Sequence, residues 1–506
     1  MDRYLAIIEV SQKQRFIFSS NKLSQNIGAS IIIREITEMI PRKHCTDEEV
    51  FFVGGGKSVY EFDSEERAKE FISCVSEEAI EQYPGVEVFM ALQKYEAEKE
   101  RVLDAVNKLY SNLEKKKSIR KSSFVIQSMG ITQLSENTNK PVIVGTDGLS
   151  AEEFAKEKAA RSKRQKAAYA DLLPEDEKYE FAMEFEDLGG TKHTKSYIGV
   201  IALDGNRMDK KFTHFRNAYE KRYEKASAAD DIYALNCEYK KAYRNLSETI
   251  ERVYRLAVRA TNTEIASRLD EMYENKKLTK NKKDGKVILP FRPLIAAGDD
   301  ICIVTDGRIA LLYTEILLNN IKTIGDRELA QIPGFRFEMR ACAGITLISG
   351  HYPFFRAHEL AEELASNAKK QLPDDDASDT CVMDFHIVQG EIEGSLSEIR
   401  KTKYDSSRMT AKPYFIEFPS TFNEKQKNEA HTLEQLKACI RYLKKADVGR
   451  GILKEYRDAL TSGEQAMRAY LNEKRMTKIL GKYERGLAFD AIETMDIYYG
   501  VEDIRK

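Results

Sequence analysis

The chain has 506 residues, with 80 Lys and Arg against 82 Asp and Glu and 42% hydrophobic residues. That length predicts about three domains, and the apolar content is typical of a globular chain and excludes a disordered one. The formal net charge of −2 excludes a protein that coats nucleic acid over its whole surface, so any nucleic-acid contact would come from local patches.

Features that report on the compartment are few. No apolar run reaches the ~18 residues that a membrane helix needs, and the N-terminal residues predict a strand rather than a signal peptide. The seven cysteines are scattered and contain no C-x-x-C pair, which favours reduced thiols and disfavours structural zinc. We therefore expect a cytoplasmic protein that has no membrane partner.

The first predicted element is a strand at 4–10, followed by a helical stretch through Ile40. The apolar runs around three consecutive glycines, FVGGGKSVY at 52–60, predict a hairpin with a tight turn. Apolar residues at four-residue spacing then predict a helix at 64–82, and a strand follows at 86–92.

The next segment is charged. A helix is predicted at 95–118, and basic runs at 114–121 and 156–167 flank a short strand-like piece at 141–145; a third basic run lies at 276–286. These runs have two interpretations. They can be solvated helix faces, or they can contact a phosphate backbone or a partner subunit.

The second half repeats the order of the first half on a longer scale. The sequence predicts a buried strand at 197–204, a long charged helical stretch at 215–283, and a strand, tight turn and strand over 286–307. The elements predicted after these are a helix at 308–324, a half-buried alternating strand at 335–348, a helix at 354–370, a strand at 382–388, and helices from 424 to 506 with breaks near Gly449, Gly451 and Gly486.

Each half, at about 1–92 and about 196–390, therefore runs strand, helix, strand, glycine turn, strand, helix, strand. That order predicts an α+β fold in which a ferredoxin-like sheet is used twice. The expected domains are a first sheet at 1–95, a helical and charged linker at 96–190, a second sheet at 191–415 with a helical insertion at about 215–283, and a C-terminal helical domain at 416–506.

Two acidic segments carry the predicted chemistry. Asp204 ends the buried strand at 197–204, and Asp299 and Asp300 occupy the tip of a hairpin. Asp is common in turns, but this fold places the end of the first strand beside the hairpin of the next two. Convergent carboxylates repel one another and are costly without a cation. Mg²⁺ prefers such hard oxygens, and two ions of Mg²⁺ or Mn²⁺ can activate a 3′-hydroxyl and neutralise a triphosphate, which is nucleotidyl transfer.

The three aspartates are accordingly the predicted catalytic and metal-binding residues, with the carbonyl of Gly205 as a further ligand. A lysine pair ends the helix at 354–370, where it can either reach a triphosphate or simply suit a helix C-terminus. The predicted nucleotide-binding residues in this half are Gly298, Asn206, Lys369 and Lys370, with Arg207 and Arg340 as weaker candidates.

The first half departs from this pattern. Its hairpin has no acid before Glu61, and its first strand offers only Glu9, so a two-metal site cannot be assembled there. This half is then either a structural partner or a second nucleotide site built from glycine backbone and a lysine. The residues of that second site would be Gly54, Gly55, Gly56 and Lys57.

Together, these segments resemble the large polymerase-type subunit of type III CRISPR effector complexes. The matching stretches, in the order found in that family, are 14–30, 52–60, 197–208, 294–304, 342–370 and 383–388. The resemblance implies two palm domains of the GGDEF and polymerase type, of which the second is catalytic. It also implies ATP as substrate, cyclic oligoadenylate as product, and guide RNA and other effector subunits as partners.

The chain departs from the family in three respects. Ala297 stands where the family's Gly-Gly-Asp-Asp turn has its first glycine, and the family's HD nuclease and cysteine zinc site have no counterpart. We therefore expect nucleotide chemistry without DNA cleavage. Two alternatives stay open: a non-catalytic architectural subunit of an RNA-guided complex, and a cyclic dinucleotide synthase or a templated polymerase that uses other nucleotides. Ring size, base and oligomeric state are not fixed by the sequence.

Overall fold

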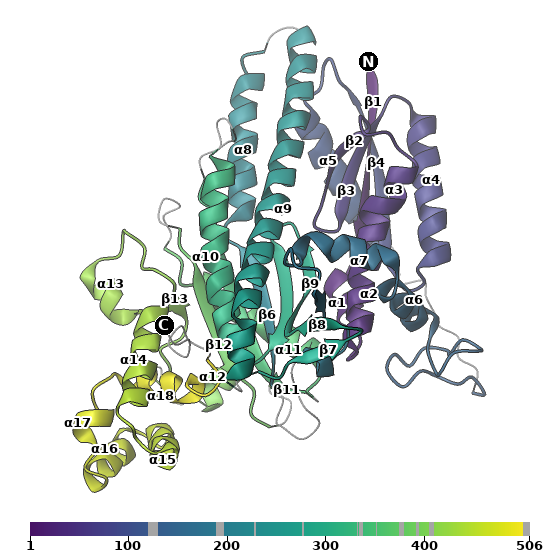
Figure 1. Ribbon diagram of the computed structural model, residues 1–506. Coiled ribbons are helices and arrows are strands. Elements are labelled where there is room, and N and C mark those ends of the chain that lie inside the picture. The colour runs from purple at the N-terminus through teal and green to yellow at the C-terminus, as the bar shows by residue number, and fades with distance from the viewer. Residues whose placement is uncertain are drawn as a thin grey trace.

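The structure is a computed structural model of the chain (Figure 1). It describes residues 1–119, 130–188, 197–226, 229–275, 278–330, 332, 337–350, 352–373, 379–390, 394–403 and 409–498. None of the helices in these ranges combines the length and the apolar character needed to cross a bilayer.

The first half forms a four-stranded antiparallel sheet in the order β2-β3-β1-β4. Even-numbered β1 residues such as Ile8 pack against the helices between the strands, and odd-numbered ones such as Ile7 pack under α5. The strands are β1 (Asp2–Val10), β2 (Val50–Gly54), β3 (Lys57–Phe62) and β4 (Val88–Glu96). The helices are α1 (Lys13–Ile17), α2 (Leu23–Arg34), a π-helical turn (Glu35–Met39), α3 (Ile40–Lys43), α4 (Glu65–Gln82) and α5 (Val102–Ile119).

The second half forms a seven-stranded sheet in the order β14-β13-β12-β11-β6-β10-β9. Its last four strands repeat the order and the antiparallel pairing of the first sheet, with β6 in the place of β1. The predicted mixture of α and β structure, with one strand order used twice, is therefore confirmed. The strands are β6 (Tyr197–Gly205), β9 (Phe291–Ala297), β10 (Asp300–Asp306), β11 (Ala341–Ser349), β12 (Val382–Ile387), β13 (Tyr414–Phe415) and β14 (His431–Thr432).

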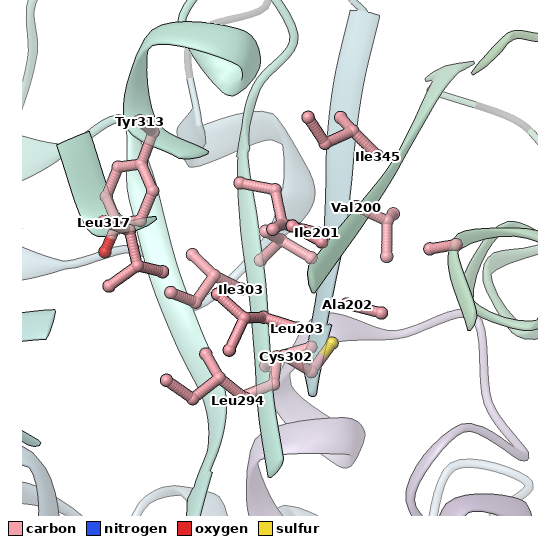
Figure 2. Close-up of a cluster of buried hydrophobic side chains, with 14 of the residues drawn as sticks. Val200, Ile201, Ala202, Leu203, Leu294, Cys302, Ile303, Tyr313, Leu317 and Ile345 are labelled. Atoms are coloured by element: carbon pink, nitrogen blue, oxygen red, sulfur yellow. The ribbon is translucent and has the colours of Figure 1, made fainter. Parts of the chain in front are cut away.

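Helices cover both faces of this second sheet. Long helices lie on one face, and α11 lies on the other (Figure 1). Figure 2 shows part of the core, in which Leu203 of β6 and Ile303 of β10 meet Tyr313 and Leu317 of α10. The helices are α8 (Met208–Tyr223), α9 (Ala229–Glu274), α10 (Ala310–Leu329), α11 (Phe354–Lys369) and α12 (Leu396–Lys403). This apolar packing fixes the ends of β6 and β10, where the predicted acids lie.

Helix α9 connects the two halves. Its 46 residues extend roughly 70 Å, so it runs past both sheets (Figure 1). Phe51 and Phe52 of β2 pack on Tyr243 of α9, with ring centroids 5.7 and 5.1 Å away. The insertion between β6 and β9 is therefore part of the core of both halves.

The predicted helical stretch at 215–283 is wrong at its end. Helix α9 stops at Glu274, and a small sheet of order β5-β8-β7 follows. The predicted strand before the acidic turn is split at Pro290, because proline has no N–H to continue a ladder. The strands of the small sheet are β5 (Tyr179–Phe181), β7 (Asn281–Lys283) and β8 (Lys286–Leu289), and β8 and β9 belong to different sheets.

Three further local predictions differ from the structure. The half-buried strand at 335–348 is β11, which starts only at Ala341 and is buried on both faces because helices cover both sides of the sheet; residues 335 and 336 lie outside the described ranges. The strand-like piece at 141–145 makes only isolated bridges. Gly486 lies inside α18, where a Cβ would come 2.8 Å from the backbone of Thr410, so this glycine serves close packing rather than a break.

The rest of the chain is mainly helical. Gly449 caps α15 as predicted, whereas Gly451 lies within that helix, where glycine costs only about 1 kcal/mol. The C-terminal helices are α13 (Glu424–Glu429), α14 (Leu433–Lys445), α15 (Arg450–Thr461), α16 (Glu464–Glu473), α17 (Thr477–Leu480) and α18 (Arg485–Thr494). The helices after α5 are α6 (Ala151–Ala160), α7 (Lys163–Tyr169) and two 3-10 turns (Ala170–Leu172 and Phe185–Leu188).

Candidate active site

The three predicted aspartates meet at one end of the second sheet. Ile301 of β10 lies opposite Leu203 of β6, so the next pair in register brings Asp300 to Asp204. A Cβ built on Gly205 would lie 3.1 Å from the Cβ of Asp299, which places that acid against the end of β6 as well. The convergence predicted from the strand order is therefore present in the fold.

The turn that carries the acids has one left-handed residue, Gly298, at φ +65°. Ala297 is the last residue of β9 and pairs with Asp300, so it has extended backbone that alanine adopts freely. One positive φ at the first turn position is typical of a type II′ hairpin. The alanine in place of the family's first glycine therefore costs the turn nothing.

Positive charge at this cluster is scarce. Burial, and then repulsion from Asp300, raises the pKa of Asp299 to about 6. Burial also raises the pKa of Asp300, against the attraction of Lys13, although its side chain is open to the cavity. The ammonium of Lys369 donates to the carboxylate of Asp204 and, at 3.0 Å, to the carbonyl of Gly205. One lysine in contact does not balance three acids.

A fourth carboxylate, Glu362 of α11, faces the same cavity. Burial, followed by repulsion from Asp300, raises its pKa to about 7, and the side chain of Gln14 donates to it. Glu362 was not among the residues predicted from the sequence. The signal was its position two helical turns before Lys369, because residues seven apart share a helix face.

Asp204 and Asp300 line a cavity of about 680 Å³ whose walls come from both halves of the chain. The glycine turn of the first sheet forms part of it, and a Cβ on Gly298 would lie 4.0 Å from the amide nitrogen of Gly55. Lys13, at the start of α1, donates to the carbonyl of Gly55 and lines the cavity. The predicted glycines Gly54, Gly55 and Gly56 therefore face the acidic turn.

The register shows what replaces the acids in the first sheet. Lys57 lies opposite Gly54 across the turn and opposite Glu9 of β1, so Glu9 takes the position of Asp204 and Lys57 that of Asp300. The ammonium of Lys57 lies 3.6 Å from the Glu9 carboxylate, and that of Lys117, on α5, lies 2.8 Å from it. Where the second sheet has two acids, the first sheet thus has one acid and one lysine. The carboxylate of Glu9 is already neutralised by Lys57 and Lys117.

Lys57 does not line the cavity. Its ammonium lies 5.7 Å from the ring centroid of Tyr110 on α5, on the face of the first sheet that this helix covers. Lys117 and Lys369 occupy matching places, since each lies near the end of the helix that follows the fourth strand of its sheet. Both lysines contact the acid at the end of the first strand.

Two predicted nucleotide ligands lie elsewhere. Asn206 is fully buried, and its amide donates to the carboxylate of Asp379 and to the carbonyl of Thr380, both at 2.8 Å. Lys370 is exposed beyond the end of α11 and is not part of the cavity wall. The structure therefore brings Lys369 to the acids and leaves its neighbour outside.

The two weaker candidates are engaged in other contacts. Arg207 donates to the carbonyl of Pro373, and Arg340 donates to the carboxylate of Asp326 at 2.8 Å. Neither guanidinium lines the cavity.

The donor set fits a divalent cation chemically. The donors are hard carboxylate oxygens, and the raised pKa values of Asp299 and Asp300 report a shortage of positive charge that Mg²⁺ or Mn²⁺ would compensate. Across the described ranges, however, no group of three or more His, Cys, Asp or Glu side chains is already arranged to hold a metal ion. The ammonium of Lys369 in contact with Asp204 is one reason, because it takes up a ligand oxygen.

The basic runs contain structural lysines. Lys156 is only 1% exposed, donates to the carbonyl of Phe16 at 2.7 Å, and thereby ties α6 to the start of the chain. Lys116 donates to the carbonyl of Met90 at 2.9 Å. Residues 120–121 and 276–277 of these runs lie outside the described ranges. Lys156 of the second run is therefore neither on a solvated face nor free for phosphate, and Lys116 of the first run is engaged within the chain.

No protein-family model matches the sequence, and no curated protein matches it. Solved structures of Csm1-Csm4 cassettes are similar in fold. A chain of the cassette in complex with cA3 is 12% identical with a TM-score of 0.46, over 98% of this chain and 69% of that chain. The cassette in complex with one ATP is 14% identical with a TM-score of 0.45, over 99% and 70%. The Csm1-Csm4 subcomplex of the type III-A CRISPR-Csm interference complex is 13% identical with a TM-score of 0.46, over 98% and 70%.

Proposed function

We propose that the protein is a nucleotidyltransferase that joins ATP units into cyclic oligoadenylate, as part of a CRISPR-type antiviral defence. The observation that carries this proposal is the convergence of the carboxylates Asp204, Asp299 and Asp300 at one end of the second sheet. Two of them, Asp204 and Asp300, line a cavity whose wall also includes a glycine turn and two lysines. Such a site suits a polyphosphate substrate, because the acids can hold cations and the backbone can approach closely. The motif resemblance described above supports the same chemistry.

In this proposal both sheets are palm domains, at 1–95 and 191–415, and the second is catalytic. The segment at 96–190 links them, and 416–506 is the C-terminal helical domain. The substitution of Glu9 and Lys57 for the acids of the second sheet supports the first sheet as the non-catalytic copy. Guide RNA and other effector subunits are the proposed partners.

Asp204, Asp299 and Asp300, with the carbonyl of Gly205, would hold Mg²⁺ or Mn²⁺. When bound, such ions lower the pKa of a 3′-hydroxyl and neutralise charge on the triphosphate. Lys369 and Lys13 line the same cavity and both attract Asp300, and Lys369 would release Asp204 if a cation took its place.

The test is synthesis by the purified full-length chain from each labelled nucleoside triphosphate with Mg²⁺ or Mn²⁺, with products identified by mass. Asp299→Asn combined with Asp300→Asn should lower the rate by about 10²-fold or more, the loss typical of removing a group that stabilises charge in the transition state. Asp209→Asn is the matched control, because Asp209 is an exposed acid in the first turn of α8. Synthesis by the double variant near the parent rate would refute the assignment.

A non-catalytic architectural role is the second candidate, and the contact between Lys369 and Asp204 favours it, since a permanent internal cation would make the acids inert. If the parent chain forms no product alone, the assay is repeated with co-purified partner subunits and target RNA. Product formed only then supports a regulated enzyme, and none under either condition supports the architectural role.

A further inference from the structure

Glu251 of α9 lines the same cavity, and it has no role in the chemistry proposed for the acids. It is half-buried, and within the described part of the chain its carboxylate has no hydrogen bond and no ion pair. Burial raises its pKa, with Arg255 opposing the effect. A carboxylate left unpaired in a cavity wall is a hydrogen-bond acceptor available to a ligand.

The cations near Glu251 are already committed. Arg34 donates to Glu38 at 2.9 Å and to the carbonyl of Ala168 at 3.2 Å. Arg255 donates to Asp171 and to the carbonyls of Ala168 and Ala296. Each arginine has its own acid, so Glu251 is one negative charge in excess at this end, which disfavours a phosphate there.

The other polar groups near it are satisfied too. The hydroxyl of Thr37 donates to the carbonyl of Ile33 at 2.9 Å, and that of Tyr169 donates to the carbonyl of Leu294 at 2.8 Å. The lining also includes apolar side chains such as Ile33, Val53 and Ile295. A wall that combines apolar side chains with an unpaired acceptor fits a heterocycle that carries a donor.

Glu251 and two of the three acids belong to the wall of one cavity. The hydroxyl of Tyr254, three residues after Glu251, lies against the end of β6 where Gly205 would carry a Cβ, so this stretch of α9 passes beside the acids. Asp204, Lys13 and Lys369 line the same cavity as Glu251. With a triphosphate at the lysines and acids, the uncharged base is the part of a nucleotide that the excess negative charge at Glu251 admits.

We propose that Glu251 determines base specificity by accepting a hydrogen bond from the exocyclic 6-amino group of adenine. The inference rests on the proposed function, because it takes the cavity as a nucleotide site. A base without an amino group at that position would leave the carboxylate buried and unpaired, and this penalty is the source of the selectivity.

The test compares the binding of ATP and purine riboside triphosphate, which lacks only the 6-amino group, to the full-length chain by calorimetry with Ca²⁺ to limit turnover. The parent chain should bind ATP about 10-fold more tightly or better, the range for a hydrogen bond to a charged group. Glu251→Met should bind the two triphosphates equally. Glu251→Gln keeps an acceptor oxygen and should retain part of the preference for ATP. This variant also provides the test if Glu251→Met does not fold.

Glu248→Met is the matched control, since Glu248 is an exposed acid on the same helix that pairs with Arg244, and it should keep the full preference. A Glu251→Met variant that still prefers ATP overturns the proposal, and so does a parent chain that prefers purine riboside triphosphate or binds it as tightly as ATP. In those cases the proposed function stands, because nucleotides still bind. Failure of the parent chain to bind any triphosphate overturns both.

Discussion

Gly344 lies in the middle of β11 at the point where α11 crosses the sheet, and Gly344→Ala tests whether that close approach positions the site. A Cβ there would lie 2.7 Å from the Cβ of Leu364 and closer still to the carbonyl oxygen of Ala361 and the amide nitrogen of Ala365. Two of these three atoms belong to the helix backbone, so no change of rotamer relieves the clash. The helix must retreat by about 1 Å to restore a normal contact.

Overpacking of this kind costs about 1–3 kcal/mol, and a backbone obstruction favours the upper end. For a unit of 150–250 residues, 3 kcal/mol lowers the melting temperature by roughly 6–12 °C. The retreat of α11 also withdraws Lys369 from Asp204, so ATP binding should weaken in the folded variant. Gly350→Ala is the control, because a Cβ at Gly350 meets nothing within 4 Å. Equal melting temperatures for Gly344→Ala and the parent chain would refute the packing argument.

Three further predictions concern single side chains. Lys369→Met should bind Mn²⁺ alone more tightly than the parent chain does, because no ammonium competes for Asp204, yet bind ATP more weakly; calorimetry that finds both weaker would contradict this role. Burial lowers the pKa of His358 from 6.5 to about 3. Between these two pH values the unfolded chain binds a proton at His358 and the folded chain does not. The stability that the protein has above pH 6.5 is therefore lost progressively as the pH falls toward 3. The free energy of unfolding falls by about 2 kcal/mol at pH 5, and His358→Phe should abolish this loss in denaturant titrations. A His358→Phe variant with the parent's pH dependence would contradict the assignment to His358. Lys57→Met should leave ATP binding intact and cost less than ~1 kcal/mol, since Lys57 pairs with Glu9 outside the cavity; lost ATP binding would return Lys57 to the nucleotide site.

Local sequence patterns were sufficient for the two sheets and the acidic turn. Gly55, Gly56 and Gly298 sit where the backbone has a positive φ, and alternating apolar runs fix the strands around them. Because the strand order follows from the order of elements in each half, the approach of Asp204 to Asp299 and Asp300 could be predicted without any long-range information.

Predictions failed where burial or strand partners depend on distant segments. The alternation at 335–348 predicted one solvated face, but helices cover both faces of β11. Pro290 divides a continuous apolar segment into β8 and β9, which belong to different sheets. An apolar segment by itself does not show with which strands its two parts pair. Asn206 follows the acidic end of β6 and was predicted to bind a nucleotide. Its amide is buried, however, and donates to Asp379 and Thr380 instead.

The sequence by itself determined the strands, the turns and the three acids, because each depends on residues close together in the chain. Only the tertiary structure decided what surrounds them. Gln14 meets Glu362 across 348 residues, and Glu251 reaches the cavity because a helix of 46 residues passes both sheets. No local pattern encodes such contacts, since they arise from the packing of the two halves, and that packing made one cavity whose wall carries both Asp300 and the glycine turn.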